Sequence, residues 1–205
     1  MRLHIPYSIK RHYYMYEYVN SKIKELLLHK AYTSGKYITP IPGLALLLGN
    51  EGAKSIISTN TLSIVFIIQG TEHITCKDKS IICHENDYFI STPQILTSCY
   101  CTGESKPFLA FSLKISRHVL SLLDTDGTTC FQQPGKRDDD SYEEDIKVDL
   151  FNCFQRLIML MNKPEQIYIR APIIICEIHY LILISKKWKH CEQSILGNHG
   201  DAHTS

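Results

Sequence analysis

Residues 108–116 have the sequence Phe-Leu-Ala-Phe-Ser-Leu-Lys-Ile-Ser, and this stretch decides the fold class. Its larger apolar side chains fall at every second position from Leu109 to Ile115, with smaller or polar side chains between them. Successive side chains of a β-strand point to opposite faces. The pattern therefore predicts a strand with one face on a core and the other nearer water, as in antiparallel sheets.

Six more short, largely apolar runs lie upstream of this strand, with turn signals between them. The runs are 44–48, 62–69, 73–77, 80–84, 88–90 and 95–100. The turn signals are Gly70, the pair Asp78-Lys79, and Thr39-Pro40-Ile41-Pro42-Gly43, where two prolines and a glycine exclude a helix. We therefore predict an antiparallel barrel or sandwich.

Segments with helical spacing of apolar residues lie on both sides of this β region. Residues 13–29 predict a helix, 118–123 a short helical turn, and two helices close the chain, the second with Pro172 near its start. The polar stretch 124–145 is typical of a loop. The predicted organisation is an N-terminal helix and arm (1–34), a barrel (35–124), a linker (125–145), C-terminal helices (146–192) and a tail (193–205).

Composition and charge narrow the class of protein. The 205 residues are 44% hydrophobic, and 22 basic against 21 acidic residues give a net charge of +1. No basic stripe is evident, so we expect no direct DNA binding by this chain. The runs 63–68 and 173–176 are too short to cross a bilayer, and the N-terminus has no secretory pattern. We expect a cytoplasmic protein, no membrane contact, and eight reduced cysteines.

Five segments, in order, resemble the N-terminal domain of AraC-type transcriptional regulators. They are 39–44 (Thr-Pro-Ile-Pro-Gly-Leu), 63–70 (Ser-Ile-Val-Phe-Ile-Ile-Gln-Gly), 88–92 (Tyr-Phe-Ile-Ser-Thr), 108–113 (Phe-Leu-Ala-Phe-Ser-Leu) and 171–183 (Ala-Pro leading to Glu-Ile-His-Tyr-Leu-Ile-Leu). The likeness covers about 32–189. It departs from the family at Leu62, where a Pro is usual, at Asn86, which replaces a turn Gly, and at Leu181, which replaces an Arg.

The resemblance implies an α+β fold: a cupin-like antiparallel β-barrel of the double-stranded β-helix type, with an N-terminal helix and two C-terminal helices. It implies a domain that holds a small effector, dimerises, or both. In complete family members two helix-turn-helix units follow this domain. This sequence ends at Ser205 before any such unit. A fragment, a truncated gene product and a stand-alone regulator-like protein all remain open.

Two sets of residues are candidates for these roles. For the effector pocket we expect inward-facing residues of the barrel to form the lining, although plain core packing explains them equally well: Phe66, Tyr88, Ile90, Phe111 and Leu113. Such a lining suits a small, largely apolar effector. The broad apolar surface of the last helix suggests a buried or paired helix, and its candidate dimer residues are Ile174, Ile178, Leu181 and Ile182. The partner would be a second copy or a full-length relative.

The alternative interpretation is a metal-dependent cupin enzyme. If Asp78-Lys79 is a two-residue turn, His73 faces His84, with Glu85 nearby. The same register pairs Ile74 with Cys83 on the other face. Apolar pairs belong inside, which would place the histidines outside, and a shifted register would separate them. No Gly-x-Ser-x-Gly or phosphate-loop motif is present. We therefore predict no metal, no cofactor and no catalytic residue.

Overall fold

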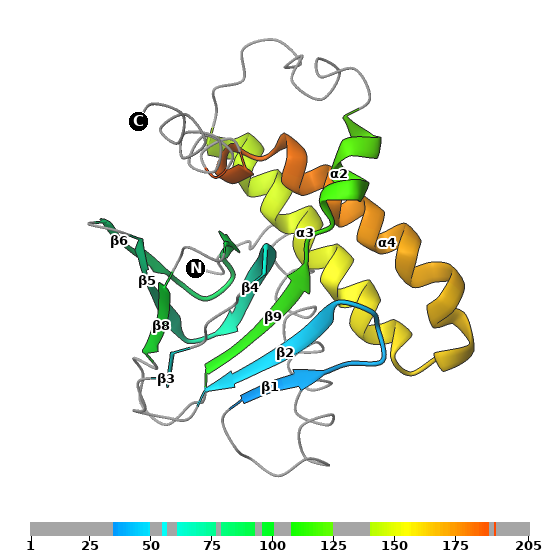
Figure 1. Cartoon of the computed structure of the whole chain (residues 1–205), viewed down its shortest axis with the longest axis horizontal. Coiled ribbons are helices and arrows are strands. Elements are labelled where there is room, and N and C mark those ends of the chain that lie inside the picture. The colour runs from blue at the N-terminus through cyan, green and yellow to red at the C-terminus, as the bar shows by residue number, and fades with distance from the viewer. Residues whose placement is uncertain are drawn as a thin grey trace, which may run out of the picture. The chain divides into compact units, whose positions relative to one another are not determined.

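The computed structural model describes residues 35–49, 55–56, 61–76, 79–92, 96–100, 108–124, 140–188 and 191. In these ranges the chain forms two antiparallel sheets and three helices, which confirms the predicted α+β class (Figure 1). The predicted helix 13–29, the tail 193–205 and most of the linker 125–145 lie outside the described residues.

The first sheet has the strand order β1-β2-β9-β4-β7, and every neighbouring pair in it is antiparallel. Its strands are β1 (Gly35–Ile38), β2 (Leu44–Gly49), β4 (Ser63–Gln69), β7 (Tyr88–Ser91) and β9 (Phe108–Lys114). The second sheet has the order β3-β8-β5-β6, again antiparallel. Its strands are β3 (Ser55–Ile56), β8 (Leu96–Tyr100), β5 (Thr71–Cys76) and β6 (Lys79–Cys83). The seven predicted strands are confirmed to within two residues; β1 and β3 were not predicted, because each is short.

The chain passes from the first sheet to the second at Gly70. The register of β4 on β9 shifts between Ile67 and Gln69, which marks a β-bulge. Gly70 then has a φ of +92°, and a Cβ atom there would lie 3.3 Å from the Phe108 ring. Among the described strands no ladder joins the two sheets, so the predicted antiparallel barrel is not closed there and consists of two separate sheets (Figure 1).

The turn before β2 has the geometry that its prolines and glycine predict. The Thr39 hydroxyl donates to the Leu44 carbonyl at 2.9 Å and accepts from the Ile41 N–H at 3.2 Å. Gly43 takes a φ of +80°, in the left-handed region that glycine favours. The turn therefore closes the β1–β2 hairpin.

Asn86 adopts the left-handed backbone conformation that suits the turn glycine usual in the family. Its φ of 67° is left-handed, and among non-glycine residues Asn adopts this region comparatively readily. The Asn86 N–H donates to the Ile67 carbonyl at 2.9 Å, and the Asp87 N–H donates to the His84 carbonyl at 3.1 Å. The departure from the family at this position leaves the turn into β7 intact.

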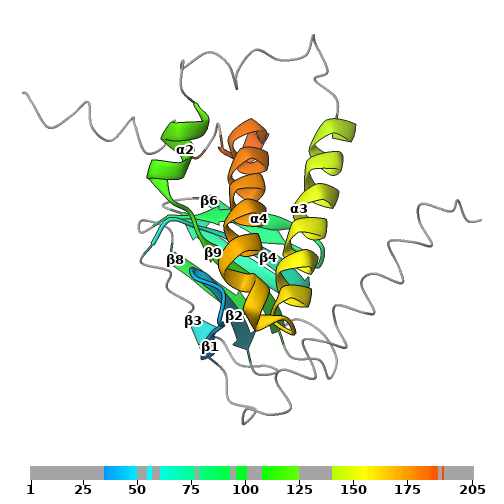
Figure 2. The ribbon, with the colours of Figure 1, turned by 90° about the vertical axis from the view of Figure 1, so that its right-hand side faces the viewer.

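Strand β9 is buried on both faces, so the prediction that one face lies near water is wrong. Ala110 and Ser112 on one face are as buried as Phe111 and Leu113 on the other. The reason is that the first sheet lies between two layers: its inner face meets the second sheet, and its outer face meets helices (Figure 2).

Three helices follow the sheets: α2 (Arg117–Leu123), α3 (Asp140–Leu160) and α4 (Pro164–Ile184). Ser116 caps α2, because its hydroxyl accepts from the Val119 N–H. The linker prediction is wrong for 140–145, which form the first turns of α3. The acidic residues in this segment suit a helix N-terminus, since the helix dipole favours negative charge there.

Helix α4 begins at Pro164, so the prediction that Pro172 lies near its start is wrong. Pro164 occupies the first turn, where a missing N–H costs no hydrogen bond. Pro172 lies in the helix interior on the exposed side. A proline there cannot donate to the carbonyl of Tyr168, four residues earlier, and Tyr168 is itself exposed.

Helix α4 is also the one described helix long and apolar enough, by length and composition, to cross a membrane. Its best window has a mean hydropathy of 1.8, and 39% of that window is buried. The prediction considered the short runs 63–68 and 173–176 and did not recognise that the second lies within this longer apolar helix. A helix packed in a soluble core passes the same test, and the inner side of α4 is buried here.

Candidate functional site

The two sheets pack together through an apolar cluster, which we call the inner cluster. Its members come from both sheets and are all buried: Leu47, Val65, Ile67, Ile74, Cys83, Phe89, Phe108 and Ala110. Val65 pairs with Phe89, and Ile67 pairs with Ala110, so these side chains share one face of the first sheet. We call this side of the first sheet, which packs on the second sheet, the inner face.

Polar groups interrupt the apolar lining of the inner face. Ser63 pairs with Ser91, and Ser112 pairs with Val65, which places three buried hydroxyl side chains on this face. The second sheet adds Glu72, which is 1% exposed and pairs with Cys83. Hydroxyl and carboxyl groups in an apolar enclosure fix the orientation of a bound molecule.

Cys83 stays protonated at neutral pH and therefore does not act as a nucleophile. Burial and the Asp87 and Glu72 carboxylates raise its pKa to about 12, although Lys187 acts in the opposite direction. The thiolate is the reactive form of cysteine, so this residue is inert at neutral pH. Cys83, Cys153, Cys176 and Cys191 are all free, which agrees with the predicted reduced state for the described cysteines.

The predicted pocket residues lie on the opposite, outer face of the same sheet. Phe66, Tyr88, Ile90, Phe111 and Leu113 are buried there. The Phe66 ring lies 5.8 Å from the rings of Phe151 and Phe154 of α3, and the Phe111 ring stacks on Phe154 at 5.8 Å. The prediction that these residues line the interior is therefore wrong: they form the core between sheet and helices.

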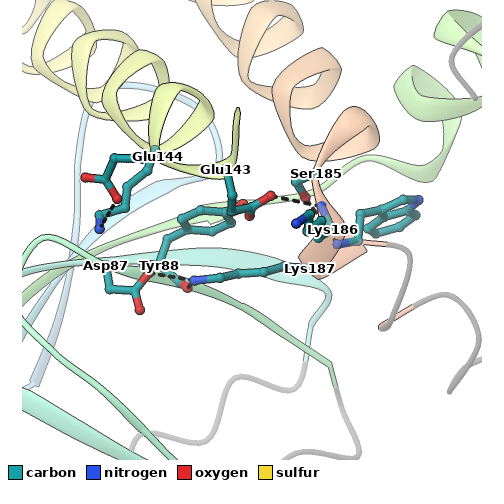
Figure 3. Close-up of polar contacts among 9 residues, drawn as sticks. Asp87, Tyr88, Glu143, Glu144, Ser185, Lys186 and Lys187 are labelled. Carbon is teal, nitrogen blue, oxygen red and sulfur yellow. Dashed lines mark hydrogen bonds and ion pairs between the residues drawn. The ribbon is translucent and has the colours of Figure 1, made fainter. Parts of the chain in front are cut away.

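The outer face is locked to the helices by a polar junction around Tyr88 (Figure 3). The Tyr88 hydroxyl donates to Glu143 Oε1 at 2.6 Å, and the backbone N–H of Lys186 donates to Glu143 Oε2 at 3.1 Å. One carboxylate therefore ties strand β7 to the first turn of α3 and to the end of α4. Burial, and then Glu143, raises the pKa of Tyr88 above its usual range, so the phenol stays a neutral donor.

Lys187 is the third charged residue of this junction and lies against one face of the Tyr88 ring. Its ammonium donates to Asp87 Oδ1 at 2.6 Å and to the Tyr88 carbonyl at 2.6 Å. It also lies 4.2 Å from the centre of the Tyr88 ring, within range of a cation–π interaction. Neither Glu143 nor Lys187 was predicted: Glu143 falls in the predicted linker, and no sequence motif marks Lys187.

His179 makes a second link between α4 and the sheet. Its Nε2 accepts from the Ser116 N–H at 2.8 Å, at the end of β9, and its Nδ1 lies 2.7 Å from the Ile175 carbonyl. An accepting Nε2 requires the proton on Nδ1, so the ring is neutral. Burial lowers the pKa of His179 accordingly.

The predicted dimer residues lie on the side of α4 that packs inside the fold: Ile174, Ile178, Leu181 and Ile182 are all buried. The opposite side exposes Ile169 (68%), Ile173 (66%) and Tyr180 (47%), with the half-buried Cys176 between them. Steps of four, three and four residues place these side chains in one row along the helix. We call them the outer row; it is this side of α4, and not the predicted one, that faces solvent.

The register that would place His73 opposite His84 does not form, and the shifted register separates the two histidines. His73 pairs with Ile82, because Cys76 pairs with Lys79 and the hairpin therefore turns one residue earlier than predicted. Within the described ranges no group of three or more His, Cys, Asp or Glu side chains could hold a metal ion.

Comparison with known proteins gives one family. Residues 40–189 match the family described as the AraC-type transcriptional regulator N-terminus. No curated protein matches the chain.

Several solved structures are similar over part of the chain. An RmlC-like cupin from Methanocaldococcus jannaschii is 14% identical over 42% of this chain and 82% of its own, with a TM-score of 0.32. A cupin superfamily protein from Desulfitobacterium hafniense is 19% identical over 36% and 66%, with a TM-score of 0.29. Hydroxypropylphosphonic acid epoxidase from S. wedmorenis is 12% identical over 36% and 44%, with a TM-score of 0.28.

Proposed function

This chain belongs to the family of AraC-type transcriptional regulator N-terminal domains, and from that premise we propose that it senses a small effector between its two sheets and pairs with a partner through α4. The observation that carries the proposal is the division of α4 into two sides. One side is anchored in the core, and the other presents the outer row to solvent. A row of large apolar side chains on a helix surface marks an interaction site.

The effector site of this proposal is the inner face rather than the residues first predicted. The inner cluster supplies an apolar wall, and the buried Ser63, Ser91, Ser112 and Glu72 supply polar groups. A small, largely apolar effector with hydrogen-bonding groups suits such a lining.

The junction around Tyr88 would carry the signal. Phe89, the neighbour of Tyr88 on β7, belongs to the inner cluster, while Tyr88 itself bonds to Glu143 on the outer face. A displacement of β7 by a bound effector would therefore reach the start of α3 and the end of α4. The outer row lies on that same α4 helix.

The partner in this proposal is a second copy of the chain or a full-length relative. The proposal assigns effector sensing and pairing to these residues, and direct DNA contact to none of them. We propose that the domain works in the cytoplasm without catalysis, metal or cofactor. Elemental analysis of the purified protein checks this, since stoichiometric Fe, Mn, Ni or Zn would favour the cupin enzyme.

Sedimentation equilibrium tests the pairing. We expect a dimer for the native chain, a monomer for Ile173→Glu, and a dimer for Leu122→Glu, which places the same charge on an exposed apolar residue of α2. If the native chain is a monomer, co-expression with a full-length relative should recover a heterodimer that Ile173→Glu abolishes. A monomer that also captures no relative would contradict the proposal.

A further inference from the structure

A hollow lies where α3 ends and α4 begins, outside the inner face and close to the first residues of the outer row. Its volume is about 210 Å³, and it is lined by Arg156, Met159, Leu160, Lys163 and Arg170. Three of these residues lie in the last two turns of α3, Lys163 lies in the connection, and Arg170 lies in the second turn of α4. The hollow therefore depends on the packing of one helix against the other.

The charged lining is entirely basic. Arg156, Lys163 and Arg170 line the hollow, and no acidic residue does. Arg156 donates through Nη2 to Glu177 and to Cys153, which leaves its other N–H groups available, since a guanidinium has five. Arg170 donates through Nη1 to Gln166. No side chain in the described part of the chain pairs with the Lys163 ammonium.

The start of α4 adds to this positive field. Lys163 is the N-cap residue, and no side chain caps the first N–H groups of this 21-residue helix. The positive end of the helix dipole therefore acts at the same corner. Glu165 in the first turn offsets part of it, but its carboxylate is not in the lining.

The size and the floor of the hollow restrict the ligand. Leu160 is buried and Met159 is half-exposed, so apolar atoms lie beside the cations. Pockets for drug-sized ligands measure roughly 300–1,000 Å³, and this hollow is smaller. A nucleotide or a long acyl chain would not fit.

We propose that this hollow binds a small organic carboxylate whose short apolar body rests on Met159 and Leu160. The carboxylate bridges Arg156 of α3 and Lys163 and Arg170 at the start of α4, through charge-assisted hydrogen bonds. The ligand then links the two helices next to the outer row. This site is separate from the effector site between the sheets.

Isothermal titration of the full chain at constant ionic strength tests the proposal with three probes: benzoate, its neutral counterpart benzamide, and inorganic phosphate. We expect benzoate to bind with a stoichiometry of one and benzamide to give no saturable heat. Phosphate should bind more weakly, because it lacks the apolar body. Equal binding of benzoate and benzamide would overturn the role of the cations, and phosphate binding without benzoate binding would overturn the ligand class.

The double variant Lys163→Gln/Arg170→Gln locates the site. We expect it to weaken benzoate binding about tenfold or more, the loss that corresponds to about one charge-assisted contact. The matched variant Lys114→Gln/Arg117→Gln removes the same charge from two exposed residues elsewhere and should change the affinity less than about twofold. Equal loss in both variants would show a general charge effect and overturn the site. Unchanged melting temperatures verify that both variants fold.

Discussion

Both faces of the first sheet are buried and largely apolar, but they pack against different layers. The inner face, with Val65, Phe89 and Ala110, looks toward the second sheet. The outer face, with Phe66 and Phe111, packs on α3 through ring contacts. Strand alternation identifies the residues that share a face, but when both faces are apolar it does not say which face encloses the interior.

Truncating one residue on each face of β4 tests whether the two faces pack against different layers. Phe66→Ala should lower the free energy of unfolding by about 3–5 kcal/mol, as expected for a buried aromatic ring. Urea denaturation measures the loss. Hydrogen exchange should accelerate mainly in α3, because Phe151 and Phe154 lose their partner ring.

Its neighbour Val65 supplies the control. Val65→Ala should accelerate exchange in the second sheet and leave α3 nearly unchanged, since Val65 belongs to the inner cluster. If both variants loosen the same elements, the assignment of the two faces is incorrect.

A smaller effect is expected at the polar junction. Tyr88→Phe removes the donor to Glu143 and leaves a half-buried carboxylate with one bond fewer. We expect a loss of about 1–3 kcal/mol in urea denaturation, the usual cost of an unsatisfied buried group. Tyr142→Phe, one residue before Glu143, is the matched control and should cost less than about 0.5 kcal/mol, as for ordinary surface substitutions. Equal losses in the two variants would argue against the junction.

The smallest effect is a pH dependence from His179. Burial lowers the pKa of His179 in the folded state, so the folded protein favours the neutral ring. Above about pH 6.5 neither state binds this proton, and the contribution is fully present. As the pH falls below that value the unfolded chain takes up a proton that the folded chain does not, and stability falls by at most about 1.4 kcal/mol per pH unit.

Urea denaturation between pH 7.5 and pH 5 measures this slope. His179→Gln should reduce it, whereas His84→Gln, at an exposed position, should leave it unchanged. A slope that is the same in all three proteins would show that His179 does not couple α4 to the sheet in a proton-dependent way.

Much of the fold follows from the sequence. Alternation in 108–115, the prolines of 39–43 and the apolar spacing of the last two helices each predict an observed element. What the sequence could not provide is the environment of each element. The start of α3 was missed because its acidic residues resemble a solvated loop until Tyr88 and the helix dipole are known.

The prediction assigned the buried side of α4 to the partner surface for a similar reason. Apolar residues occupy most of its circumference, so periodicity could not separate the core side from the exposed side. Tertiary packing, which includes contacts between α3 and α4, decides which side is buried. Ile178 and Ile182 lie in the core, and Ile173 is exposed.

The most direct test of the account is hydroxyl-radical footprinting of the native chain at low and high concentration, read by mass spectrometry. If the chain pairs through the outer row, Ile169, Ile173 and Tyr180 lose labelling as the concentration rises, while Leu122, which is also exposed, keeps its labelling. Unchanged labelling of the outer row in a protein that nonetheless dimerises would place the partner surface elsewhere and contradict the account.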